Sequence, residues 1–203
     1  MHSAPALLIL HILLLVAWLG IDVGVFSSSF VMRRPTMSTE TRMTVRRIMR
    51  SLDLAPRVSL ILMIPVVIAL AHTTGFGLTN TPEWLLWLVG AGGLAWAGVS
   101  VVSFRATGPT GVAPEWAASF ARVDGGLRAT ASLFFITTGV WSLSGGGPWN
   151  ADWVAWKSLI FGAIIAMGLW IRVAARRYHP ALADLLENGE SEERLAAVNE
   201  KIR

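Results

Sequence analysis

The sequence predicts an all-α fold: a polytopic membrane helical bundle with five transmembrane helices, with its N-terminus outside and its C-terminus in the cytoplasm. Three observations predict this class. Of the 203 residues, 54% are hydrophobic and only 15% are charged, and a soluble domain of this size does not need so much apolar surface. The apolar residues gather into runs close to the ~20 residues with which a helix crosses a bilayer. The arginines gather between those runs, which is the pattern of the positive-inside rule.

The five apolar runs define a bundle over residues 1–178. The predicted spans are 6–28, 58–73, 84–104, 127–143 and 153–173. The second span contains Pro65, which should kink it, and the third follows Pro82, which should lie in its first turn. The first span is too long for the core of a signal peptide, so we expect it in the mature protein. The remaining residues, 179–203, should form a short helical tail in the cytoplasm.

The arginines set the predicted orientation. Seven lie between the first and second spans, and three lie between the third and fourth when Arg128 at the start of the fourth is counted, whereas the other two connections contain no Lys or Arg. Positively charged connections stay in the cytoplasm, so the N-terminus should lie outside. We expect a multi-pass protein of the bacterial inner membrane, in contact with the lipid bilayer. We expect no nucleic-acid partner, because the basic residues cluster at helix ends rather than on one face.

The two outer connections look like membrane-surface loops. Gly145 to Pro148 has the composition of a flexible turn. Five tryptophans near that face should form an interfacial belt; these are Trp84, Trp87, Trp149, Trp153 and Trp156. Cysteine is absent, which excludes disulfides and thiolate metal sites.

The first span is interrupted by two ionisable residues, His11 and Asp22. Ionisable side chains are costly in hydrocarbon, so both should face protein or water. At helical periodicity Trp18 and Asp22 return to within about 20° of the direction of His11, with His11 and Asp22 roughly 16 Å apart along the axis. His11 either hydrogen-bonds a neighbouring helix or, in the functional interpretation, binds a metal ion or haem with Trp18 beside it.

Two further polar residues should lie on the same outer side as His11. His72 closes the second span, and Lys157 lies about one turn into the fifth. Imidazoles from two helices, His11 and His72, could be the axial ligands of a haem or two ligands of a copper ion. His72 could also be a plain interfacial residue. Lys157 could extend toward the headgroups or line the cofactor site.

A second polar cluster is predicted on the inner side. It comprises Asp22, Asp53, Arg57, Asp124 and Arg128. Asp124 and Arg128 are one helical turn apart and able to pair. The cluster should be an ion-pair network that fixes the bundle. A proton route, or a site for haem propionates or an anionic substrate, remains the functional alternative, because arginine suits carboxylates and phosphates.

Two segments resemble known membrane proteins. Residues 10–13 (LHIL) followed by 16–20 (VAWLG) resemble the first helix of the HemJ-type protoporphyrinogen oxidases and of the CopD-type copper-resistance domain proteins. Residues 153–172, which begin with aromatic residues near a lysine and end in a basic cluster, are similar to a later helix of both families. The resemblance implies a helical bundle with haem b near His11 in the first case, or copper handling in the second.

Together these features predict a membrane protein that binds haem b or a metal ion in the outer half of its bundle. Its role would be electron transfer or redox chemistry, and it could be a membrane oxidoreductase. The first alternative is copper or small-solute transport. The second is a non-catalytic membrane subunit, or a homo-oligomer, whose small-residue faces such as Gly90, Gly93 and Ala97 pack against partner chains. No serine-hydrolase, zincin or phosphate-loop motif is present in the sequence.

The predicted orientation can be tested with a reporter fused after Arg203. A reporter that is active only in the cytoplasm should give full signal, because the arginine-rich connections hold that face inside. A reporter that is active only in the periplasm should stay silent at the same position. The reverse pattern would contradict the predicted orientation.

Overall fold

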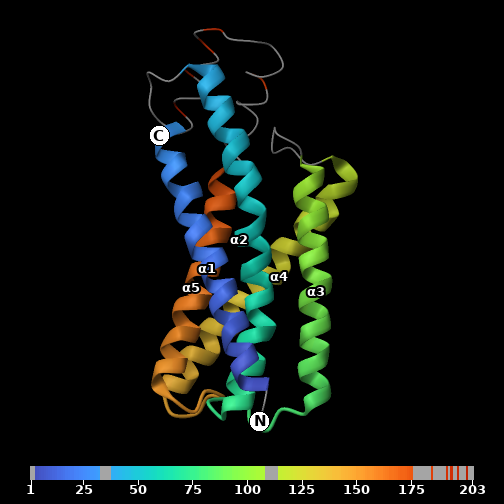
Figure 1. The fold of residues 1–203 in the computed structure, drawn as a ribbon, viewed down its shortest axis with the longest axis vertical. Coiled ribbons are helices and arrows are strands. Elements are labelled where there is room, and N and C mark those ends of the chain that lie inside the picture. The colour runs from blue at the N-terminus through green and yellow to red at the C-terminus, as the bar shows by residue number, and fades with distance from the viewer. Residues whose placement is uncertain are drawn as a thin grey trace.

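The computed structural model describes residues 3–32, 38–107 and 114–175, together with the isolated positions 184, 191, 193, 196 and 200. Over these ranges it contains five long helices, α1 (Ser3–Met32), α2 (Thr39–Thr74), α3 (Glu83–Ala106), α4 (Glu115–Leu143) and α5 (Asp152–Ala175). They form an elongated bundle in which successive helices run in opposite directions (Figure 1). The predicted all-α fold is confirmed. The predicted tail helix lies outside the described residues, apart from those isolated positions.

Four helices in the described part of the chain are long and apolar enough to cross a membrane. Their apolar stretches are Ala4–Ser28 in α1, Met43–Thr74 in α2, Glu83–Ala106 in α3 and Asp152–Val173 in α5. The chain is therefore a membrane protein, as its composition predicted. α4 is also long enough to cross a membrane, with 29 residues, but the charged side chains of Asp124 and Arg128 interrupt the apolar sequence of its first half.

α2 begins at Thr39, well before the predicted start at residue 58, and continues as one helix through Pro56 and Pro65. Ser38 caps it, since the Ser38 side chain accepts a hydrogen bond from the backbone N–H of Thr41, and such a cap satisfies one of the unpaired donors of the first turn. The predicted start was wrong because hydropathy locates the edge of an apolar span and not the end of a helix. Much of the arginine-rich connection is thus helical.

α4 shows the same difference, since it begins at Glu115 and not near residue 127. The carbonyl of Pro114 accepts hydrogen bonds from the backbone N–H groups of Ala117 and Ala118, at 2.9 and 3.1 Å. A smaller correction concerns Pro82, which precedes the first turn of α3 as its N-cap rather than lying within it.

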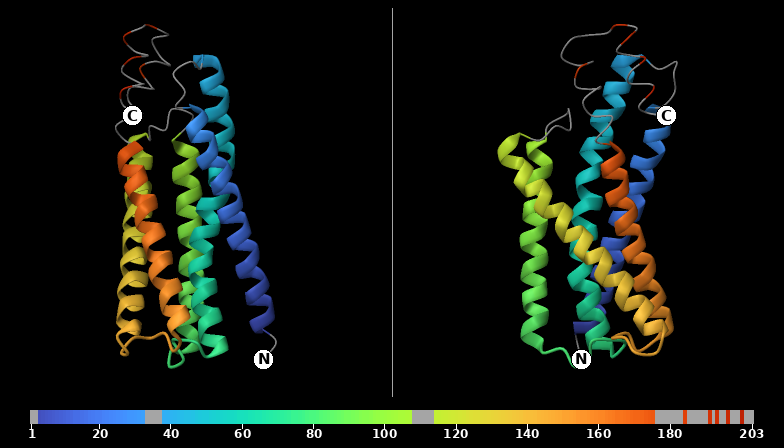
Figure 2. Two further views of the ribbon diagram at one scale, coloured as in Figure 1. Left: turned by 90° about the vertical axis from the view of Figure 1, so that its left-hand side faces the viewer. Right: turned by 180° about the vertical axis from the view of Figure 1, so that it is seen from behind.

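α4 crosses the bundle obliquely, from beside α3 at its start to beside α5 at its end (Figure 2). The crossing is close because Gly139 has no side chain. A Cβ atom added there would lie 2.9 Å from the carbonyl oxygen of Ala155 and from the backbone nitrogen of Leu159. Small residues allow helix backbones in membrane proteins to approach in this way.

Hydroxyl groups also join α4 to α5. The Ser132 hydroxyl donates to the carbonyl of Gly162 at 2.8 Å, and the Ser158 hydroxyl donates to the carbonyl of Phe135 at 2.8 Å. All four residues are buried. The polar side chains of α4 that lowered its hydropathy are thus used inside the bundle.

The small-residue face of α3 packs within the chain. Gly93 is buried, and a Cβ atom added there would lie 2.9 Å from the ring of Pro65 in α2. Ala97 is buried beside it, in an apolar cluster with Ile61 and Trp96. The surface of α3 around Gly93 and Ala97 is therefore covered by α2.

The two loops at the end of the bundle where α1 begins pack against each other. The backbone N–H of Leu78 donates to the carbonyl of Pro148 at 3.0 Å, and that of Asn150 donates to the carbonyl of Phe76 at 2.8 Å. Trp149 lies under these bonds and is only 6% exposed. The assignment of Trp149 to an interfacial belt was therefore wrong, because the loop that was predicted to be a flexible turn folds over its ring. The other four tryptophans of the predicted belt are exposed.

The α4–α5 contact gives a stability prediction. Gly139→Ala should lower the free energy of unfolding by about 1–3 kcal/mol, because the new methyl group overpacks against the backbone of α5. Gly125→Ala is the matched control in the same helix, since a Cβ atom there meets nothing within 4 Å, and it should be neutral or stabilising by up to about 1 kcal/mol. Denaturant unfolding in detergent measures both, and equal effects would contradict the close contact.

Candidate functional site

Two groups of polar side chains lie at opposite ends of the bundle. We call the end where α1 begins and α2 terminates the His11 end, and the end where α4 begins the Asp124 end. At a rise of about 1.5 Å per residue, His11 lies roughly 12 Å from the start of α1, whereas Asp124 lies roughly 28 Å from the far terminus of α4. The two groups are therefore separate sites.

His11 is half-buried on α1, and its Nδ1 atom is buried without a hydrogen-bond partner among the described residues. A buried polar atom without a partner costs about 1–3 kcal/mol. Groups of this kind in a native structure call for an explanation, such as a functional role or a bound ion or ligand. His11 thus has a nitrogen that the rest of the described chain leaves unused.

His72 lies at the same end, three residues before the cap of α2. Its Nδ1 atom is 2.8 Å from the carbonyl oxygen of Leu78, and because a carbonyl only accepts, Nδ1 carries the proton. This bond fixes the ring and does not involve Nε2. Metal-ligating histidines commonly have this arrangement, in which one ring nitrogen donates to a carbonyl and the other binds the metal.

Trp18 is 5% exposed and belongs to the main apolar core. Its ring contacts that of Phe161 edge-to-face, with centroids 5.7 Å apart, and Phe161 contacts Phe135 in the same way at 5.0 Å. These aromatic pairs join α1, α5 and α4. Trp18 therefore has a packing role in this structure, and its contact with a cofactor stays a prediction.

Lys157 is exposed on α5, with its Nζ atom 4.7 Å from the centroid of the Trp153 ring. A cation over an indole face is attracted by its electron density. The charge of Lys157 also acts on His11, which places the two residues within electrostatic range. The structure thus brings Lys157 near His11 but directs its ammonium group to Trp153.

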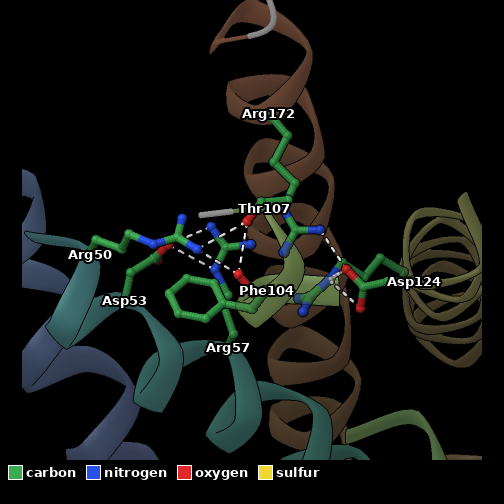
Figure 3. Close-up of polar contacts among 8 residues, drawn as sticks. Arg50, Asp53, Arg57, Phe104, Thr107, Asp124 and Arg172 are labelled. Atoms are coloured by element: carbon green, nitrogen blue, oxygen red, sulfur yellow. Dashed lines mark hydrogen bonds and ion pairs between the residues drawn. The ribbon is translucent and has the colours of Figure 1, made fainter. Parts of the chain in front are cut away.

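The Asp124 carboxylate is the centre of the second group, and it is 4% exposed. It accepts a hydrogen bond from Trp96 Nε1 at 2.9 Å. It also accepts from Arg128 Nε at 3.1 Å and from Arg172 Nη1 at 2.6 Å (Figure 3). These donors come from α3, α4 and α5. A buried charge must be paired and hydrogen-bonded, and this carboxylate satisfies that requirement from three helices.

Arg57 and Asp53 form a half-buried ion pair one turn apart on α2. Arg50 reaches from α2 to the terminus of α3, where it donates to the carbonyl of Phe104 at 2.6 Å and to the hydroxyl of Thr107 at 3.1 Å. Arg50 and Arg57 both lie over the ring of Phe104. The basic side chains of α2 are thus held against α3.

The members of the predicted inner cluster lie at one end of the bundle. The charge of Arg57 acts on Arg128 and on Arg172, so the ion pair on α2 and the Asp124 group are electrostatically coupled. Asp22 is exposed on α1 and lies within electrostatic range of Asp53 and Arg57. Its inward orientation, expected from its cost in hydrocarbon, is not what the structure shows, because the surface of α1 beside it is uncovered.

Sequence reasoning missed Arg172 and Trp96 as partners of Asp124, and Arg50 as a link between α2 and α3. Two signals could have identified the first two. Arg172 lies in the last turn of an apolar span, where a cation needs either a headgroup or a carboxylate. Trp96 lies in the middle of α3 and is buried, and a buried indole N–H normally has a partner.

The Asp124 group gives a second prediction. Asp124→Asn removes the charge that holds Arg128 and Arg172 while it keeps the side-chain shape, so the free energy of unfolding should fall by about 3–5 kcal/mol. Asp53→Asn changes the net charge equally, but its pair is half-exposed and should cost about 1 kcal/mol or less. Denaturant unfolding of both variants in detergent makes the comparison, and a loss that is no larger for Asp124→Asn would contradict the central role of this carboxylate.

The resemblance to the HemJ-type and CopD-type proteins concerns α1 and α5, which carry His11 and Lys157 at the same end of the bundle. Its implications for this chain stay a prediction. Comparison of the chain with known protein families, with curated proteins and with solved structures found no match.

Proposed function

We propose that this chain is a five-span protein of the bacterial inner membrane that binds haem b through His11, in the outer half of the bundle, and serves in electron transfer. The observation that supports the proposal best is the unpartnered, buried Nδ1 atom of His11. An imidazole nitrogen in an apolar helix is a ligand of choice for haem iron. A ligand there would also remove the cost of the unpaired polar atom.

His72 is the proposed second axial ligand. It belongs to α2, the helix that packs against α1, and both histidines lie at the His11 end. The bond from Nδ1 to the carbonyl of Leu78 orients the ring and leaves Nε2 available. That bond comes from the loop that Trp149 and Pro148 hold in place, so the loop packing supports the orientation of His72.

The donor set favours haem over a bare copper ion. A haem macrocycle supplies the equatorial ligands itself, so one or two imidazoles complete the coordination of its iron. A bare metal ion takes most of its ligands from the protein, and the described residues include no group of three His, Asp or Glu side chains that could hold one. Bound haem would supply reversible one-electron transfer, and a redox enzyme activity built on it is the further possibility within this proposal.

The side chains around His11 would control that site. Trp18 is buried against Phe161 in the apolar core, and a low-polarity environment tunes the reduction potential of a haem. The charge of Lys157 lies within range of His11, where it would favour an anionic group on the ligand, such as a carboxylate. Lys157 therefore belongs to the proposal as an electrostatic neighbour.

The proposed topology includes α4 as the fifth span, with the N-terminus outside. The buried polar residues of α4 support this, because Ser132, Thr138 and Ser142 face the protein interior and need not meet lipid. A helix that shields its polar side chains in this way can cross a bilayer at moderate hydropathy. The orientation rests on the arginine distribution, which also places the Asp124 end in the cytoplasmic half.

A second candidate function, a subunit of a larger membrane assembly, is favoured by one observation on α1. Asp22 is exposed there, and Cβ atoms added at its neighbours Gly20 and Gly24 would meet nothing within 4 Å. A partner helix could approach closely at this position and pair with the carboxylate. Purified protein without a haem spectrum would favour this candidate over the first.

The haem proposal predicts the spectrum of a variant. Wild-type protein purified after expression with haem supplied should show the absorption bands of a haem, and His11→Ala should lose them. Insertion into the membrane should survive, because removal of a polar group from a helix centre favours the bilayer.

The measurement is an ultraviolet–visible spectrum of the dithionite-reduced protein, normalised to protein content. Leu10→Ala is the matched control, since Leu10 is the neighbouring exposed residue of α1, and its spectrum should equal that of the wild type. An unchanged spectrum in His11→Ala, or a wild type without haem bands, would refute the proposal.

A further inference from the structure

The Asp124 end carries more positive than negative charge in its partly buried groups. Arg50, Arg57, Arg128 and Arg172 converge there from α2, α4 and α5, and the carboxylates that they contact are those of Asp53 and Asp124. The exposed Asp22 adds a third carboxylate nearby. An ion-pair network whose only role is to hold helices together needs no excess of cations, because each unpaired buried charge is costly.

Arg128 is the arginine of this end that has a buried N–H group without an acceptor. The residue is 6% exposed, and its Nε atom donates to Asp124. Its Nη2 atom is buried and has no hydrogen-bond partner among the described residues. A guanidinium group has five N–H donors and loses much of its hydration on burial, so a buried Nη2 without an acceptor indicates that an acceptor is missing from the described chain.

Arg57 and Arg172 flank Arg128 from two other helices. Figure 3 shows Arg172 reaching from α5 to Asp124, and Arg57 on α2 beside Asp53. The charge of Arg57 acts on both of the other arginines. Asp124 cannot supply the missing acceptor, because both of its oxygens already accept from Trp96, Arg128 and Arg172. The Arg172 side chain is 29% exposed, which leaves the group open on that side.

The depth of the arginines matches the phosphate layer of a membrane. Counted along their helices from the His11 end, Arg128 lies roughly 22 Å, Arg57 roughly 26 Å and Arg172 roughly 30 Å away, and the hydrocarbon core is about 30 Å thick. The group therefore extends from the inner part of the hydrocarbon core to the boundary with the headgroups. Basic pockets between membrane helices at this depth are known to bind phosphate-bearing headgroups.

We propose that Arg57, Arg128 and Arg172 form a binding site for one phosphate group. Phosphate oxygens accept charge-assisted hydrogen bonds from guanidinium groups, with two donors of one arginine often engaged at once. The phosphate would accept from the unused Nη2 of Arg128 and neutralise the excess charge. It belongs either to an acidic phospholipid of the surrounding leaflet or to a soluble phosphorylated ligand, and it reaches the site from the exposed side of Arg172.

The test uses the purified full-length protein and two probes. Inorganic phosphate is titrated calorimetrically into protein in a neutral detergent, with chloride in the reference at equal ionic strength. Phosphatidylglycerol retained by the protein is counted by native mass spectrometry, with phosphatidylcholine as the reference lipid. Saturable binding of phosphate alone assigns the site to a soluble ligand, retention of phosphatidylglycerol alone assigns it to a lipid, and both results support the proposal. Binding of neither probe to folded wild type overturns it.

Two variants locate the site. Arg128→Lys keeps the charge beside Asp124 but removes the second nitrogen of the fork, and Arg57→Gln removes one charge from a half-exposed residue. Each should weaken the binding of the positive probe by about tenfold or more. If Arg128→Lys does not give a monodisperse folded protein, Arg57→Gln alone decides.

The matched controls are Arg105→Gln and Arg122→Gln, which remove the same charge from exposed residues of α3 and α4. They should change the affinity by no more than about twofold, because exposed charges at a distance are screened by salt. Equal losses in the controls and in Arg57→Gln would overturn the proposal, since they would reflect the general charge of this end of the bundle.

Discussion

The Asp124 carboxylate is the interaction on which the arrangement of the helices depends. It joins the indole of Trp96 on α3 to the guanidinium groups of Arg128 on its own helix and Arg172 on α5. α4 can therefore lie beside α3 where it begins and still reach α5. Toward the other terminus of α4, Gly139 and Gly162 bring its backbone against α5. One charged contact and one small-residue contact together set the oblique path of α4.

The membrane explains why that contact is electrostatic and why α4 carries most of the buried polar side chains. Helix association in lipid gains little from the hydrophobic effect, so close packing and interhelical hydrogen bonds supply more of the stability. α4 provides both, since Ser132 donates to α5, and Ser158 of α5 donates back to Phe135. The polar residues that bring the hydropathy of α4 down are thus the residues that attach it. Hydropathy alone therefore identifies the other four helices as membrane-spanning and leaves α4 out.

The sequence predicted the apolar segments well because hydropathy reports directly on what lipid tolerates. It did not predict where α2 and α4 begin, because those extensions depend on local capping by Ser38 and Pro114 rather than on lipid. The pairing of Asp124 with Arg128 followed from their spacing along one helix. The roles of Arg172 and Trp149 depend on contacts between elements distant in the chain, and no local pattern contains that information. Where His11 and Trp18 lie is now known, whereas their relation to a cofactor is still a prediction.

The two ends of the bundle act nearly independently in energetic terms. His11 and the Asp124 group are roughly 16 Å apart along the bundle, and one unit charge at that distance acts with about 1 kcal/mol at an effective dielectric constant of about 20. A change in charge at the Asp124 end would therefore shift a redox centre at His11 only slightly and could not create or abolish it. Conversely, the unpaired nitrogen of His11 has no bearing on the unpaired nitrogen of Arg128 at the other end. The His11 end is apolar with one imidazole nitrogen left over, and the Asp124 end is cationic with one guanidinium nitrogen left over, so the two proposed ligands rest on separate observations.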